Sequence, residues 1–146
     1  MKFSKHSISA PLQKQLANHV YDIIACIHFV YRDLGNGLPE YIYQEALAKY
    51  LTFKGFNIKK EYQHHPIFMD EQLDAYIKID IVVLLPKGNV IIECKAISKI
   101  SNREQFQTFG YLRGTNFPIA LLVNFGTFPN AEIQRYYYKD DLLYVF

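Results

Sequence analysis

Residues 76–96 decide the fold, and they read YIKIDIVVLL (76–85), PKG (86–88) and NVIIECKA (89–96). Both flanks are rich in Ile and Val, which favour strands. Pro86 and Gly88 interrupt them, as expected for a hairpin with a connection of about four or five residues. The pattern therefore predicts two antiparallel strands joined by a short loop.

The register of this hairpin brings two carboxylates together. If residues 85–88 form the loop, Leu84 faces Asn89 and Asp80 lies opposite Glu93. Directly opposed Cβ atoms are roughly 4.5–5.5 Å apart, and like charges at that distance repel. A divalent cation would explain the pair, because Mg²⁺ takes hard oxygen ligands at about 2.0–2.1 Å. Lys95 projects from the same face as Glu93, since side chains alternate along a strand.

The opposite face of the hairpin is apolar throughout in this register. We expect it to carry Ile79, Ile81, Val83, Leu85, Val90, Ile92, Cys94 and Ala96. An uninterrupted apolar face is typical of a sheet that helices cover. The alternative interpretation is that Glu93 and Lys95 form part of an exposed cross-strand salt bridge at an edge, which would contribute little stability.

Composition limits the classes of protein that this chain can represent. Its 146 residues, half of them apolar and including 12 Tyr and 11 Phe, suit one domain over 1–146 with a sizeable core. A net charge of +2 does not by itself indicate nucleic-acid binding, although a local basic patch remains compatible with it. Cys26 and Cys94 lack metal-ligand spacing, so we expect a reduced, cytoplasmic compartment. No secretory signal or apolar run of ~20 residues is visible, and we expect no membrane span.

Three helices are predicted from the helical spacing of apolar residues, over 12–34, 39–54 and 101–113. Gly35, Gly55 and Gly114 are expected to end them. Ser101 and Glu104 have the spacing of a capping box at the start of the third helix.

Strands are predicted over 56–69 (one or two strands), in the hairpin, over 118–125 and at the end of the tail 133–146. Residues 70–72 are expected to form a polar turn, and residues 1–10 a loose N-terminal segment. The order is ααβββαβ plus a C-terminal strand. It predicts an α/β fold in which helices flank a short mixed sheet.

Four motifs together resemble those of a known family. Residues 37–43 (GLPEYIY) match the G-x-x-E-x-x-Y signature that names a family of small bacterial proteins. Asp80 and residues 93–95 (ECK) resemble the D…E-x-K core of the PD-(D/E)XK nuclease superfamily, to which that family is assigned. Residues 107–111 (QTFGY) resemble the Q-x-x-x-Y element of its exonuclease branch, and residues 123–126 (VNFG) resemble a strand ending in N-F-G. The chain departs from the pattern in lacking the proline of the "PD" name, which removes no ligand.

The resemblance implies a restriction-endonuclease-like core and a metal-dependent site. Asp80 and Glu93 would bind Mg²⁺ or Mn²⁺, with the backbone carbonyl of Cys94 as a third oxygen ligand. Lys95 would orient or activate the attacking water and offset charge on the phosphate. Glu40 would supplement the acidic cluster and help to hold a second ion, although a carboxylate in the first turn of a helix also simply favours the helix dipole.

Further residues are candidates for contact with nucleic acid. Gln107 and Tyr111 are four residues apart and share a helix face, from which they could reach a metal-bound water or a phosphate. Lys99 and Arg103 could line a phosphate path, since backbone contacts dominate such binding. The alternative is a packing or solvated role for each of them, and Tyr43 is interpreted as a packing residue.

Three interpretations of function follow from these observations. The first is a metal-dependent nuclease that hydrolyses phosphodiester bonds in nucleic acid, with DNA expected on family grounds. The alternative is a catalytically silent module that keeps the nuclease fold and binds nucleic acid or protein. A third interpretation is a homodimer that uses the aromatic tail, with Tyr136, Tyr137 and Tyr138, as its interface.

Overall fold

The computed structural model describes residues 2–4 and 14–146. The helices are α1 (Lys14–Leu34), α2 (Glu40–Phe53) and α3 (Asn102–Thr115). The strands are β1 (Lys2–Ser4), β2 (Asn57–His64), β3 (Ile67–Phe68), β4 (Glu71–Gln72), β5 (Ile77–Leu84), β6 (Val90–Lys95), β7 (Ile119–Asn124), β8 (Glu132–Lys139) and β9 (Leu142–Val145). None of the described helices is both long and apolar enough to cross a membrane.

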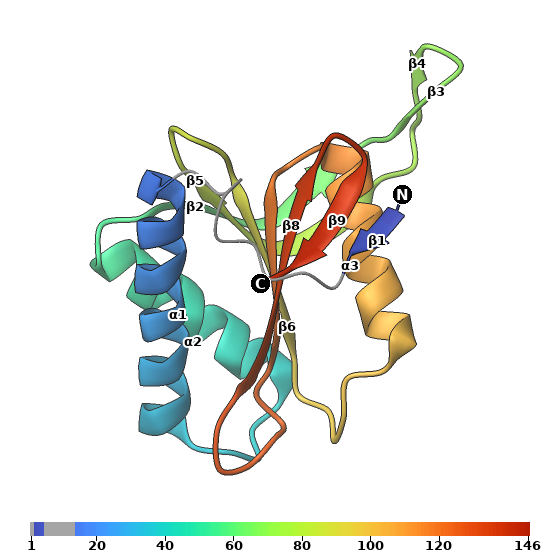
Figure 1. Cartoon of the computed structure of the whole chain (residues 1–146). Helices are drawn as coiled ribbons and strands as arrows, with labels where there is room; N and C mark the ends of the chain where they lie inside the picture. Colours follow the sequence, from blue (N-terminus) through green and yellow to red (C-terminus); the bar gives the residue numbers. More distant parts are fainter. Residues whose placement is uncertain (1, 5–13) are drawn as a thin grey trace.

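A seven-stranded mixed sheet lies between two helical layers, in the strand order β1-β9-β8-β7-β6-β5-β2 (Figure 1). The helices α1 and α2 cover one face, and α3 covers the other (Figure 1). β6 and β7 are parallel neighbours connected through α3, and antiparallel pairs flank them. Because both faces are covered, β6 and β7 consist almost entirely of buried residues. The predicted α/β fold is confirmed.

The helices form where the apolar spacing predicts them. Residues recurring three or four positions apart place the apolar stripe of α1 against the sheet, and Gly35 ends the helix at φ +77°. Pro39 precedes α2 in an extended conformation, and Gly55 at φ +94° follows it. The part of the first predicted helix before Lys14, including Leu12, lies outside the described residues.

The third helix extends further than the sequence predicts. Its capping box is confirmed, because the Ser101 backbone N–H donates to Glu104 Oε2 at 2.8 Å. Gly114 does not end it. The chain continues as a helix to Thr115 and leaves at Asn116, which adopts the left-handed conformation at φ 59°. Asn can adopt this conformation through local hydrogen bonding of its short side chain, so a glycine is not required here.

Three segments form β-strands where the sequence did not predict them. Residues 70–72 are not only a turn, because Glu71 and Gln72 form β4, which pairs with β3 in a separate two-stranded sheet. The tail forms two strands, β8 and β9, rather than one. At the N-terminus, β1 pairs in parallel with β9, while residues 1 and 5–13 lie outside the described part of the chain.

The tyrosines of the tail pack inside the fold. β8 lies between β7 and β9, so its side chains alternate between the two helical layers. Tyr136 is buried on the α3 side and Tyr137 on the α1 and α2 side, while Tyr138 packs partly buried against the α3 cluster. This placement accounts for the tyrosines by strand packing and leaves little of the first two exposed for stacking on a base or a partner.

Candidate metal centre

The two predicted carboxylates lie where β5 and β6 separate. β5 pairs with β6 from Val83↔Val90 to Ile81↔Ile92, which is the predicted register. Its pairing with β2 continues further, to His64↔Ile77. Beyond Ile81, β5 therefore follows β2 and leaves β6, and the next residues on the two strands are Asp80 and Glu93. We refer to this separation of the strands as the fork.

The side chains of the two acids span the fork by reciprocal hydrogen bonds. The Asp80 backbone N–H donates to Glu93 Oε1 at 2.9 Å. The Cys94 backbone N–H donates to Asp80 Oδ2 at 2.8 Å. Carboxylate oxygens thus take the place of the backbone carbonyls that a regular ladder would supply. This arrangement keeps the two carboxylates together and uses one oxygen of each.

One expectation about the faces of β5 is wrong. Ile81 and Val83 pack on the α1 and α2 side as predicted, whereas Ile79 packs on the α3 side. The alternation shifts at Asp80, where β5 leaves β6. On β2, Glu61 lies opposite this point with φ 50°, between the pairs Lys60↔Ile81 and Tyr62↔Ile79, and is not itself paired in the ladder. A strand that is irregular at one residue does not keep its side-chain parity across it.

Burial makes the carboxyl pair electrostatically unfavourable in the absence of a cation. Glu93 is only 3% exposed, and this burial, followed by the charge of Asp80, raises its pKa to about 8. Burial also raises the pKa of Asp80, against the opposing effects of the Cys94 hydrogen bond and of Lys95 and Lys78. A buried carboxylate without a close cation is normally protonated rather than ionised.

Lys95 lies next to the pair without forming an ion pair with it. It is half-buried at the end of β6, and its Nζ donates to Gln107 Oε1 of α3 at 3.2 Å. Within residues 2–4 and 14–146, no ion pair joins Lys95 to Asp80 or Glu93. Its positive charge nevertheless lowers the pKa of both carboxyl groups. The structure therefore places Lys95 and Gln107 together beside the acids.

Glu40 approaches the same site from the start of α2. Glu40 is exposed, but partial desolvation of its carboxyl group by the surrounding protein raises its pKa. The charge of Lys95 lowers this pKa, and that of Asp80 raises it. Gln44, one turn later, donates from Nε2 to the Asp80 carbonyl at 3.4 Å, so this part of α2 contacts β5 at the fork. Glu40 does not complete a ready-made cluster. Across the described residues, no three side chains of His, Cys, Asp and Glu converge as a metal site.

The remaining predicted residues differ in how near they lie to the acids. Tyr111 is half-buried on α3, one turn after Gln107, and its pKa is raised by burial and then by Glu93 and Asp80. It is therefore part of the same environment. Lys99 and Arg103 are exposed in the segment after β6 and in the first turn of α3. Among the described residues, no hydrogen bond or ion pair connects these two with the carboxylates, and their role stays a prediction.

The residues at the fork fit a divalent cation. The donors are oxygens, which Mg²⁺ and Mn²⁺ accept, and Mg²⁺ usually keeps several waters beside one or two carboxylates. The Cys94 N–H points toward β5, and its C=O points to the same side because the two groups of one residue share an edge in a strand. Two carboxylates and one carbonyl therefore face one gap, and the buried pair lacks the positive charge that a cation would supply.

Asn124 is a residue of the site that sequence reasoning did not identify as functional. It is fully buried, and its Oδ1 accepts from the Ile97 N–H at 3.0 Å and from the Gly126 N–H at 2.9 Å. Its Nδ2 donates to the Ile97 carbonyl at 2.9 Å. Asn124 thus holds the chain two residues after Lys95. The signal was available in the sequence as a single polar residue that ends an apolar strand before Phe125 and a glycine.

Tyr43 connects the start of α2 with this turn. Its hydroxyl donates to the Gly35 carbonyl at 2.6 Å and accepts from the Leu38 N–H at 3.1 Å. Its ring stacks on Phe125 with 4.5 Å between centroids. Asn36 also donates from Nδ2 to the Phe125 carbonyl at 3.0 Å. The interpretation of Tyr43 as a packing residue is confirmed, and this packing holds the segment that carries Glu40 beside the ends of β6 and β7.

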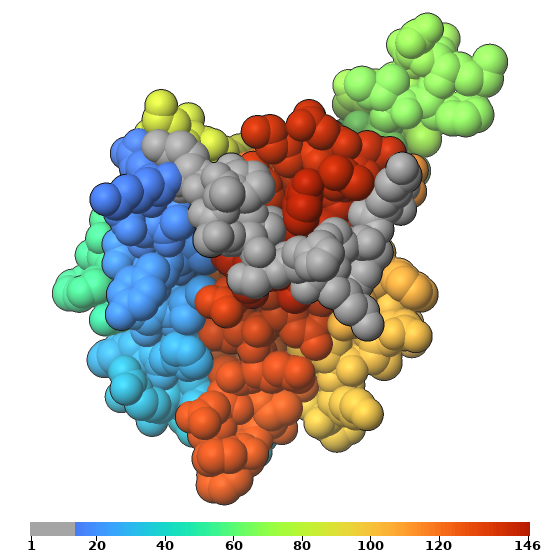
Figure 2. All heavy atoms as spheres, viewed as in Figure 1, coloured from blue at the N-terminus to red at the C-terminus, as the bar shows by residue number. Residues whose placement is uncertain are grey.

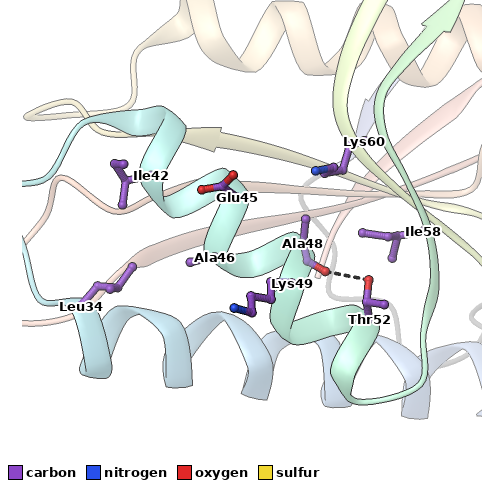
Figure 3. Close-up of a pocket in the computed structure, with 9 residues that line it drawn as sticks. All are labelled: Leu34, Ile42, Glu45, Ala46, Ala48, Lys49, Thr52, Ile58 and Lys60. Carbon is purple, nitrogen blue, oxygen red and sulfur yellow. Dashed lines mark hydrogen bonds between the residues drawn. The ribbon is translucent and has the colours of Figure 1, made fainter.

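An open cavity of about 720 Å³ lies between α2 and β2 (Figure 3). Its lining residues are Leu34, Ile42, Glu45, Ala46, Ala48, Lys49, Thr52, Ile58 and Lys60. It includes none of the acids of the fork, and its lining has one carboxylate and two lysines. The size of this cavity therefore does not connect it with the site that the sequence predicts.

The comparisons with known proteins agree with this geometry. A family model described as the PD-(D/E)XK nuclease superfamily matches residues 17–136. The match covers most of the chain and includes the fork, α3 and Asn124, so the chain belongs to the PD-(D/E)XK nuclease superfamily. Nucleases of this superfamily typically use divalent metal ions. No curated protein and no solved structure matches the chain. The narrower resemblance to the G-x-x-E-x-x-Y family stays a prediction.

Proposed function

We propose that this protein is a metal-dependent nuclease that hydrolyses phosphodiester bonds in DNA, and that the fork is its active site. The observation that supports this most strongly is the buried pair of Asp80 and Glu93, held together by hydrogen bonds across two separating strands. Like charges at such a position destabilise the fold unless a cation balances them. The match of the chain to a nuclease superfamily supports the same conclusion.

Asp80, Glu93 and the carbonyl of Cys94 would hold Mg²⁺ or Mn²⁺. Such an ion, when bound, polarises a phosphoryl oxygen and lowers the pKa of a bound water. Glu40, at the margin of the site, is proposed to bind a water of the hydrated ion or to support a second ion. The negative charge of the carboxylates at the fork would then attract the cation, and the cation would attract the phosphates of the nucleic acid.

Lys95 is proposed to contact the scissile phosphate. In the hydrolysis, a bond forms between a water oxygen and phosphorus, and the bond from phosphorus to one sugar oxygen breaks. The Lys95 ammonium would donate a hydrogen bond to a phosphoryl oxygen as negative charge develops there. Gln107 holds the ammonium by the hydrogen bond to its Oε1 and is proposed as a positioning residue. Tyr111, Lys99 and Arg103 are proposed to bind the backbone of the nucleic-acid strand.

Cleavage of purified nucleic acids tests this proposal. Linear double-stranded DNA, single-stranded DNA and RNA are incubated with the protein and Mg²⁺ or Mn²⁺. DNA cleavage should fall by more than about 100-fold in Asp80→Asn and Glu93→Gln, because even residues behind metal ligands typically contribute 10–100-fold. Lys95→Met should also lose cleavage. Lys139→Met is the matched control, since Lys139 is an exposed lysine of the same sheet, on β8.

The outcome separates the enzyme from the catalytically silent module. Cleavage that requires the ion and both acids supports the enzyme. Cleavage that survives in both acid variants would come from a contaminant or another site and would contradict the proposal. Binding of DNA without cleavage, under every ion tested, would favour the silent module. Cleavage of RNA alone would overturn the choice of DNA as the substrate.

A further inference from the structure

A short hairpin stands away from the body of the protein. We call residues 65–76 the arm; it contains β3 and β4, which pair with each other and with no strand of the main sheet (Figure 1). In the space-filling view the arm projects beyond the rest of the surface (Figure 2). It has a defined structure at its base, where the Leu73 N–H donates to the Pro66 carbonyl at 2.9 Å.

The tip of the arm is apolar and exposed. Ile67, Phe68 and Met69 all project into solvent, and Met69 is 81% exposed. Two-stranded hairpins are marginally stable alone in water, and a contiguous exposed apolar group usually marks a contact surface. The arm also contains Asp70, Glu71 and Asp74 but neither Lys nor Arg. Its acidic character disfavours nucleic acid as the partner, because phosphates repel it, and favours a protein surface with a positive charge.

The surface along α3 and β9 has both an apolar character and a positive charge. An open groove of about 570 Å³ lies there, lined by residues of α3 and one residue of β9: Asn102, Gln105, Phe106, Phe109, Gly110, Arg113 and Leu143. The α3 positions recur at helical spacing and form one stripe. Phe106 is 65% exposed, and Arg113 supplies the positive charge. Gln107, which contacts Lys95, is not among the residues that line this groove.

Gly110 leaves open space in this groove. A glycine inside a helix destabilises the helix relative to alanine. Within residues 2–4 and 14–146 no neighbour requires a glycine there, because a Cβ built on Gly110 meets no atom within 4 Å. Gly110 has a helical conformation with a negative φ, so the backbone does not require a glycine there either. A close approach by another molecule along the groove provides the missing reason.

We propose that the arm of one molecule binds in the α3 groove of a second copy, and that the exchange is reciprocal. The apolar tip matches the apolar groove, and the acids of the arm match Arg113. One chain carries both surfaces, and its own arm extends away from its body (Figure 2). A reciprocal exchange buries two arms and two grooves and closes as a two-fold dimer, without exposed ends that could extend into a fibre. The proposal does not depend on nuclease activity, and it uses neither the fork nor the three tyrosines of the tail; from the tail it uses only Leu143.

Light scattering of the full chain over a range of concentrations is the first test. The wild type should approach twice the monomer mass as the concentration rises. Phe68→Asp and Gly110→Leu should each shift the monomer–dimer midpoint upward by at least 10-fold, the second because leucine fills the groove where the monomer has open space. Phe53→Asp, which changes a still more exposed phenylalanine on α2, is the matched control and should dimerise normally. Arg113→Glu tests the groove independently of any effect of leucine on folding.

Disulfide trapping identifies the two surfaces directly. Met69→Cys and Gly110→Cys proteins are mixed and oxidised; the native cysteines, Cys26 and Cys94, are buried. A disulfide-linked dimer should form in the mixture and not with either variant alone. A wild type that stays monomeric at the highest soluble concentration would overturn the proposal. So would linkage of Met69→Cys to itself alone, or arm variants that weaken DNA binding and leave the mass unchanged.

Discussion

Replacing Glu93 with glutamine is predicted to stabilise the metal-free protein at pH 8 and to reduce the dependence of its stability on pH. Burial and Asp80 raise the pKa of Glu93 to about 8 in the folded protein, whereas the pKa of an unperturbed glutamate is about 4.3. At a pH between these two pKa values, the folded state holds a proton that the unfolded state has released. The free energy of unfolding therefore falls as the pH rises. This contribution is complete below about pH 4.3 and is lost as the pH passes through 8.

The size of the effect follows from the same values. One pKa unit corresponds to about 1.4 kcal/mol, so stability should fall by nearly that amount per pH unit, flattening close to pH 8. From pH 6 to pH 8 the loss attributable to Glu93 is about 2 kcal/mol. In a chain of this size that lowers the melting temperature by roughly 4–8 °C. Glutamine keeps an oxygen that can accept the Asp80 N–H at 2.9 Å, and it has no charge to bury.

Urea unfolding at pH 6 and pH 8, with a chelator present, measures this difference. The wild type should lose stability between the two values, and Glu93→Gln should lose about 2 kcal/mol less. Glu45→Gln, an exposed glutamate on α2, serves as the control and should behave as the wild type. Parallel curves for the wild type and Glu93→Gln would refute the conclusion that Glu93 is buried in an unfavourable charged pair.

Three further predictions concern the support of the site and its loading with metal. Asn124→Ala should lower the free energy of unfolding by about 2–4 kcal/mol in urea titrations, because it leaves the backbone N–H groups of Ile97 and Gly126 without their acceptor; unchanged stability would contradict this. Gly126→Ala should unfold at a much lower temperature, since a Cβ there lies 2.2 Å from the Ile97 carbonyl oxygen, whereas Gly110→Ala should be neutral or stabilising. Binding of Mn²⁺ at pH 7 should release about one proton, because the pKa of Glu93 is about 8 before binding; calorimetry in buffers of different ionisation enthalpy measures this, and a release of zero would contradict it.

The register of the hairpin could be predicted from the sequence because local chemistry determines it. Pro86 and Gly88 define the loop, and the apolar pattern allows one pairing without placing acids in the core. The structure confirms this register at Ile81↔Ile92. What the pattern could not predict is that β5 leaves β6 at the next residue. That departure depends on β2, a strand distant in sequence, and it puts Ile79 on the α3 side.

The residues that support the site contact segments that are distant in the sequence, so their role could not be predicted as readily as the register of the hairpin. The Asn124 side chain hydrogen-bonds to the backbone of Ile97, and Tyr43 hydrogen-bonds to Gly35 and stacks on Phe125. Neither set of contacts produces a periodic pattern in the sequence. The burial that raises the pKa of Glu93 also arises only when α3 and the sheet assemble. By contrast, the presence of Asp80, Glu93 and Lys95 on one hairpin was visible, because alternation and register are local properties.

A crystal of the protein soaked in Mn²⁺ and measured for anomalous scattering shows directly whether the fork binds a divalent cation. We predict a strong peak at the fork, within about 2.0–2.6 Å of oxygens from Asp80 and Glu93 and of the Cys94 carbonyl. The peak should be absent from crystals of Asp80→Asn. Manganese bound elsewhere, or a fork in which the two carboxylates turn away from each other with no ion between them, would contradict the account.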